Sequence, residues 1–165
     1  MNWEVLLRLF LICLVPAGIS VGMFFIEKKT KFNVIPFIWQ QVIIGVIFGG
    51  CAIFGNELGF NIGDGIVANV SDAGVLCAGF VFGGPAGIIA GVIGGVYRAI
   101  QPVLYGYSIG VYTWVACSVS CVLAGLFAYL VRVFMFEDKR PNFGFALAVS
   151  VIMEVIHMMI LCLTK

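Results

Sequence analysis

The chain has 165 residues, of which 62% are apolar and only 10% are charged, and its mean hydropathy is +1.15. A soluble domain carries a charge on roughly a quarter of its residues, so this composition excludes a soluble globular domain and predicts an integral membrane protein. The net charge of +1, without a long basic stretch, argues against a nucleic-acid partner, because binding to phosphates needs clustered Lys and Arg.

The apolar residues form runs whose lengths approach the roughly 20 residues with which a helix crosses a bilayer. The residues before the first run include an acid, Glu4, ahead of the base Arg8, whereas a signal peptide begins with positive charge. The run itself is also longer than the apolar core of a signal peptide, so an uncleaved first helix is expected. The sequence thus predicts an all-α integral membrane bundle of about six transmembrane helices, in one domain over 1–165. The predicted spans are 5–26, 36–55, 65–83, 85–105, 109–136 and 143–163.

The third predicted span differs from the others. It begins with Asn69, Ser71 and Asp72, and its apolar stretch is then too short to cross a bilayer before the Gly-Gly-Pro sequence at 83–85. Either a polar half-helix lies at mid-depth facing protein or water, or the segment 73–98 enters the bilayer and returns. Both interpretations place a short or broken glycine-rich helix pair in the middle of the bundle, because irregular backbone at that depth cannot face lipid.

Lys and Arg are concentrated in two predicted loops, at 28–31 and at 132–140. The positive-inside rule places both loops in the cytoplasm. The connections 56–72 and 97–108 then lie on the outer side of the membrane. The same count puts Lys165 outside, so a cytoplasmic effector fused after this chain would need at least one more span.

Cysteines are frequent, but all of them lie inside apolar runs, which predicts free intramembrane thiols rather than disulfides. The chain has one histidine, His157, and no Cys-x-x-Cys pair, so no metal site and no cofactor are predicted. The cysteines are Cys13, Cys51, Cys77, Cys117, Cys121 and Cys162.

Glycines recur every fourth residue at Gly83, Gly87, Gly91 and Gly95. This spacing predicts a smooth groove for close helix packing, since helix association in lipid depends on van der Waals contact. A phosphate-binding loop would need a Gly-Lys-Ser/Thr ending that is absent.

Arg98 ends this glycine-rich segment and is the one basic residue between Lys31 and Arg132. A guanidinium at this depth needs an anionic partner, and its planar fork suits a carboxylate. Two interpretations are open: Arg98 extends from a helix end to the membrane surface, or it anchors an acidic ligand. Asp72 is a candidate internal partner, which would make the pair structural.

Two further polar groups lie inside predicted spans. The stretch 117–120 carries hydroxyls that either bond to carbonyls of their own helix or face a cavity. Glu154 and His157 share one helix face and form a candidate intramembrane polar pair, which either relays protons or is mutually satisfied. No nucleophile stands beside a recognisable base, so no enzymatic activity is predicted.

Two motifs in the middle of the chain carry a family resemblance. One is the Asn-Val-Ser sequence at 69–71, and the other is an ungapped pattern of a proline, spaced glycines and a final arginine from Pro85 to Arg98. With the following stretch 107–117 and Ser120, they resemble the transmembrane receptor region of the LytS/YhcK type. The similarity extends across nearly the whole chain.

Members of this family are sensing modules of bacterial histidine kinases of the LytSR two-component type, of diguanylate cyclases and of other signalling proteins. The resemblance implies a multi-pass receptor in the bacterial inner membrane that passes its ligand state to a cytoplasmic effector, in cis or in trans, and it is compatible with a homodimer. The family has an Asn-x-Arg motif whose arginine is Ser71 here, so a charge that would share an anionic ligand with Arg98 is missing. No catalytic domain follows before Lys165, so a receptor fragment or a protein acting through a partner is expected.

The main hypothesis is therefore an outward-facing polar pocket that binds a small acidic metabolite. Arg98 would hold the acidic group, and the glycine-packed helix would change position with ligand occupancy. The expected ligand-binding residues are Asn69, Ser71, Asp72, Arg98, Cys117 and Ser120.

Two other hypotheses remain. A small-solute transporter or substrate-binding membrane subunit is the alternative, because broken helices around a midplane cavity also describe such proteins, although no inverted repeat is detectable. A structural or holin-like protein whose partner is the lipid bilayer alone is the third. It predicts that Asn69, Asp72 and Arg98 face lipid headgroups separately, without a shared cavity.

Overall fold

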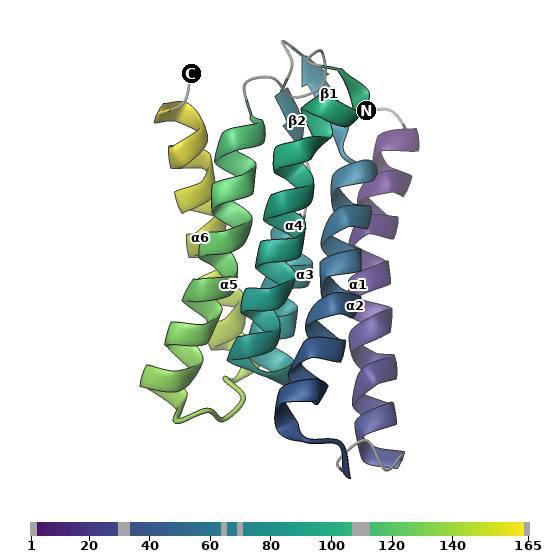
Figure 1. Cartoon of the computed structure of the whole chain (residues 1–165). Helices are drawn as coiled ribbons and strands as arrows, with labels where there is room; N and C mark the ends of the chain where they lie inside the picture. The colour runs from purple at the N-terminus through teal and green to yellow at the C-terminus, as the bar shows by residue number, and fades with distance from the viewer. Residues whose placement is uncertain (1–2, 30–33, 64–65, 69–70, 107–112, 164–165) are drawn as a thin grey trace.

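The computed structural model describes residues 3–29, 34–63, 66–68, 71–106 and 113–163. They form a bundle of roughly parallel and antiparallel helices with a small hairpin at one end (Figure 1). In chain order the elements are α1 (Trp3–Lys29), α2 (Phe37–Glu57), β1 (Phe60–Gly63), β2 (Ile66–Ala68), α3 (Ser71–Cys77), the π-helix η2 (Ala78–Phe82), α4 (Gly84–Tyr105), α5 (Trp114–Phe136) and α6 (Phe143–Leu163).

Three of the described helices have the length and the apolar composition that crossing a bilayer requires. α2, α4 and α5 are long and apolar enough to cross a membrane, and shorter apolar stretches lie at Leu14–Ile26, Ser71–Phe82 and Phe143–His157. Large side chains such as Phe134 and Phe143 point outward from the bundle, where lipid would cover them. The predicted helical membrane bundle is confirmed.

α4 lies between α2 and α5 and approaches both closely (Figure 1). Most of its buried residues are Gly or Ala. A Cβ atom added to Gly87 would lie 2.7 Å from Gly79 Cα, and one added to Gly91 would lie 2.6 Å from the Cys121 carbonyl oxygen. Backbone therefore packs directly on backbone, as small residues permit in lipid.

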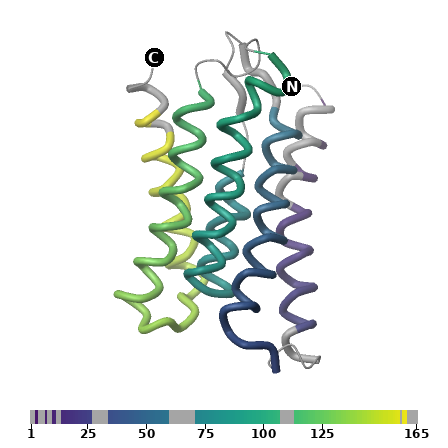
Figure 2. Tube along the Cα trace, viewed as in Figure 1, coloured from purple at the N-terminus to yellow at the C-terminus, as the bar shows by residue number. Residues whose placement is uncertain are grey.

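The third predicted span is a half-helix. α3 and η2 together cover only 71–82, and Figure 2 shows that this stretch starts part-way along the bundle and runs away from the hairpin end. α4 then begins after Gly83 and runs back along the full bundle. The structure therefore agrees with the interpretation in which 71–82 is a polar half-helix that faces protein.

Gln41 of α2 completes the hydrogen bonding at the break between η2 and α4. Its Nε2 donates to the Phe82 carbonyl oxygen at 3.3 Å, and its Oε1 accepts from the Ala86 backbone N–H at 3.2 Å. Helix ends leave backbone groups without partners, and lipid supplies none. A side chain on Gly83 would collide with this amide, since a Cβ atom there would lie 2.1 Å from Gln41 Oε1.

Replacing Gln41 with Leu should lower the free energy of unfolding by about 1–3 kcal/mol, because it leaves a buried carbonyl and a buried N–H without partners. Chemical unfolding in mixed detergent micelles measures the change. Gln40→Leu is the matched control at the neighbouring position, where the side chain is only half-buried and donates to the Ile35 carbonyl. An equal loss in both variants would contradict the role assigned to Gln41.

The hairpin of β1 and β2 was not predicted. The strands pair antiparallel, with Phe60 opposite Ala68 and Asn61 opposite Val67. The sequence between them contains Gly-Asp-Gly at 63–65, which is typical of a hairpin turn. This signal was missed because the segment was treated as a polar connection between spans.

The end of α1, which carries Lys28 and Lys29, and the turn between α5 and α6 lie at the end of the bundle opposite the hairpin (Figure 1). At this end Arg132 of α5 donates to the Gly79 and Phe80 carbonyls of η2 and pairs with Asp138 at 3.1 Å. It thereby ties the end of the half-helix to the turn that leads into α6. The grouping agrees with the loop arrangement expected from the positive-inside rule.

Candidate functional site

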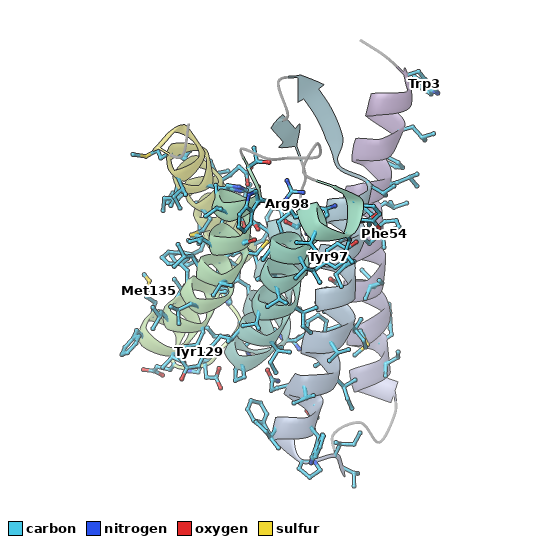
Figure 3. All side chains as sticks on the ribbon, turned by 45° about the horizontal axis from the view of Figure 1, so that its top comes forward. Trp3, Phe54, Tyr97, Arg98, Tyr129 and Met135 are labelled. Atoms are coloured by element: carbon cyan, nitrogen blue, oxygen red, sulfur yellow. The ribbon has the colours of Figure 1, made fainter. Side chains whose placement is uncertain are left out.

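Arg98 of α4 lies inside the bundle near the hairpin end (Figure 3). Its exposed fraction is only 1%. Nη1 donates to Gln101 Oε1 and Nη2 donates to Thr113 Oγ1 at 2.9 Å. Its Nε has no hydrogen-bond partner, and no carboxylate pairs with it among the residues that the structure describes. Arg98 is thus buried rather than extended to the membrane surface.

Glu57, at the end of α2, belongs to the same hydrogen-bond network and is linked to Arg98 through Gln101. It accepts hydrogen bonds from Tyr97 and, more weakly, from Gln101 Nε2 at 3.3 Å and Tyr105 at 3.4 Å. The nearest acidic group of this network therefore reaches Arg98 only through Gln101. The direct hydrogen-bond partners of the guanidinium are thus neutral, and its Nε could still donate to a bound anion.

Asp72, in the first turn of α3, is the centre of a second polar cluster. Its Oδ2 accepts from Ser120 Oγ and from His157 Nδ1, both at 3.0 Å, and its Oδ1 accepts from Cys121 Sγ at 2.9 Å. Ser71 lies beside Cys121, with 3.2 Å between Oγ and Sγ. The charge partner of Asp72 is therefore His157 of α6, and the pairing with Arg98 considered from the sequence is not observed.

The residues proposed as one ligand pocket divide between these two clusters. Ser71, Asp72 and Ser120 meet around Asp72, whereas Arg98 lies in the other cluster. Cys117 interacts with the His157 ring and belongs to the first. Asn69 is outside the described residues.

The two clusters are neighbours along α5. Thr113, which contacts Arg98, precedes Cys117 by one helical turn, and the Cys117 N–H donates to the Thr113 carbonyl at 2.9 Å. Buried polar groups thus follow one face of α5 from the Arg98 cluster to the Asp72 cluster.

The glycines bring Arg98 close to α5. A Cβ atom on Gly95 would lie 2.8 Å from the Ser118 carbonyl oxygen, so α4 and α5 touch through backbone just before Arg98. Gly91 and Gly87 make equally close contacts further along α4. Gly83 lies before the start of α4, against Gln41.

Glu154 and His157 lie near each other, but they do not form an isolated pair. His157 bonds to Asp72, and one ligand atom each from Asp72, Glu154 and His157 lies within 4.8 Å of the others. Glu154 also borders a groove of about 480 Å³ between α3–η2 and α6. The sequence paired Glu154 with His157 but did not place Asp72 beside them.

Several site residues were missed from the sequence. Gln101, Thr113 and Glu57 all take part in the Arg98 network. Tyr97, Gln101 and Tyr105 are spaced four residues apart on α4, which would have revealed a polar helix face. Thr113 carried no signal, because its contact depends on how α5 packs against α4.

Charged groups buried among bilayer-crossing helices define a polytopic membrane protein with an internal polar site, the class to which receptors and transporters belong. Within this class, the family model described as the 5TMR of 5TMR-LYT matches residues 25–165. The chain therefore belongs to this family, the membrane sensor region of LytS-type signalling proteins. The resemblance seen in the sequence is confirmed.

The matched family is a sensor region rather than a catalytic domain. No curated protein and no solved structure gives a significant match to the chain. The site residues are therefore assigned from the contacts and burial described above.

Proposed function

We propose that this sensor region binds a small acidic ligand beside Arg98 and passes its occupancy to a cytoplasmic signalling effector. The observation that carries the proposal is the burial of a guanidinium that has no carboxylate partner in the described structure and has an unmatched Nε. An unpaired charge is costly at this depth. A bound carboxylate would neutralise it and accept from Nε.

The position of the site supports a ligand that enters from the outer side. Arg98 lies near the hairpin end (Figure 3), and the basic ends of α1 and α5 lie at the other end (Figure 1). By the positive-inside rule the hairpin end faces outward. Ser71 and Ser120, together with the Cys117 thiol, would orient the uncharged part of the ligand from the neighbouring cluster.

Occupancy can be transmitted if the ligand binds one helix arrangement more tightly than another. Arg98 is on α4 and Thr113 directly precedes α5, so an anion between them would change the contact of these two helices. α5 continues to Arg132, which holds η2 and the turn to α6. A path of packed elements thus leads from the site to the basic end.

Replacing Arg98 with Ala should weaken binding of the best carboxylate at least tenfold, because a hydrogen bond to a charged group contributes about 1.5–3 kcal/mol. The probe is a panel of two- to six-carbon mono- and dicarboxylates, with affinity measured by calorimetry on the purified chain in lipid nanodiscs. Arg140→Ala removes an exposed arginine at the basic end and should leave affinity unchanged.

Unchanged affinity in Arg98→Ala would remove the guanidinium from the site. Uptake of a labelled carboxylate into liposomes containing only this chain would instead support the transporter hypothesis. The thermal stability of both arginine variants must match that of the wild type, so that a loss of binding is not a loss of fold.

A further inference from the structure

Three side chains able to bind a metal ion converge within the bundle. Asp72 comes from α3, and Glu154 and His157 come from adjacent turns of α6, with one ligand atom of each within 4.8 Å of the others. A Glu-x-x-His spacing lets one helix supply two metal ligands from the same face. Ligand atoms bound to one ion at about 2.1 Å are roughly 3–3.5 Å apart, so small side-chain rotations would close the site.

His157 faces the carboxylates with its Nδ1. This nitrogen lies 3.0 Å from Asp72 Oδ2, which is already close to the separation of two atoms that bind one ion. A bound ion would replace the proton between these two atoms, because an imidazole nitrogen binds metal in its unprotonated form. The ring is only 6% exposed, so packing in the bundle holds it in this position.

The charge of the cluster also favours a cation. Two carboxylates face one imidazole, and no Lys or Arg is paired with either carboxylate among the described residues. Two carboxylates, a neutral imidazole and a divalent cation sum to zero charge. Neutral complexes are the ones that a low-dielectric interior tolerates.

Space is available for the remaining ligands. Asp72 and Glu154 both line the groove of about 480 Å³ between α3–η2 and α6, whose other walls are mainly apolar. The cluster therefore has open positions that water could occupy, as in exchangeable rather than closed metal sites.

We propose that Asp72, Glu154 and His157 form a binding site for a divalent first-row transition-metal ion. One nitrogen and two oxygen donors suit Zn²⁺, Co²⁺ and Mn²⁺. The ion would join α3, the half-helix, to α6. This site does not require the acidic ligand proposed above, and its experiment can succeed or fail separately.

The experiment titrates metal-free full chain, in nanodiscs and without a polyhistidine tag, with Co²⁺ and then with Zn²⁺. We expect one ion per chain and a Co²⁺ absorption band that Zn²⁺ abolishes. His157 is the sole histidine in the chain, so an imidazole signature at the zinc X-ray absorption edge assigns the ion to this cluster. Sulfur ligands in place of imidazole would overturn the proposal.

Glu154→Gln removes one anionic ligand on the exposed side of α6 and should preserve the fold. Affinity should fall at least tenfold in this variant. Glu137→Gln is the matched control, because Glu137 is an exposed carboxylate at the end of α5, and it should bind as the wild type does. Equal binding in both variants, or no binding to the wild type, would overturn the proposal.

Discussion

Replacing Asp72 with Ala should lower the free energy of unfolding by about 3–5 kcal/mol, because it leaves a buried group without its charge partner. Asp72 accepts hydrogen bonds from His157, Ser120 and Cys121, which belong to two other helices. All three donors are buried and would lose their acceptor. Unfolding in mixed detergent micelles measures the loss.

Asp72→Asn keeps the shape and one acceptor oxygen, so its loss should be clearly smaller. Replacing His157 with Leu in the Asp72→Ala background tests the pairing. The double variant should lose less stability than the sum of the two single variants, because neighbours in one network are not additive. Additive losses, or a loss below about 1 kcal/mol in Asp72→Ala, would contradict the buried pair.

Replacing Gly87 with Val should destabilise the protein by about 3 kcal/mol or more, at or beyond the upper end of ordinary overpacking. The first added carbon would already lie 2.7 Å from Gly79 Cα and 3.1 Å from Gly79 N. These are backbone atoms and cannot rotate away. Either α4 must separate from the half-helix or both must deform, and unfolding in mixed micelles reports the cost.

Gly50→Val is the matched control, because a Cβ atom on Gly50 of α2 has no neighbour within 4 Å. The same substitution at this open position should change stability by less than about 0.5 kcal/mol. Similar losses at the two positions would mean that valine acts through helix propensity rather than through the contact of α4 with η2.

The spans and the half-helix could be predicted because both follow from the number of apolar residues available. The stretch after Asp72 is too short to cross a bilayer, and the structure ends it at Phe82. The glycine spacing of α4 likewise follows from the need of helices in lipid for close contact. These are local properties of the chain.

Of the site, only the ionisable residues inside the spans could be predicted from the sequence. Arg98, Asp72 and His157 stand out because ionisable groups are scarce inside spans. Their pairing could not be predicted, since Asp72 meets His157 only through the relative height of α3 and α6. The same reason hid the three-residue cluster with Glu154, because a search for Cys and His spacing detects only ligands that are close in sequence.

Gln41 has a mechanical consequence for this sensor region. One amide holds the end of η2 and the beginning of α4 together, so separating them would strand polar groups of three segments in hydrocarbon at once. Moving α2 away from the break between η2 and α4 would therefore cost two buried hydrogen bonds. The half-helix is thus attached at both of its ends, through Gln41 to α2 at its end and through Asp72 to α5 and α6 at its start.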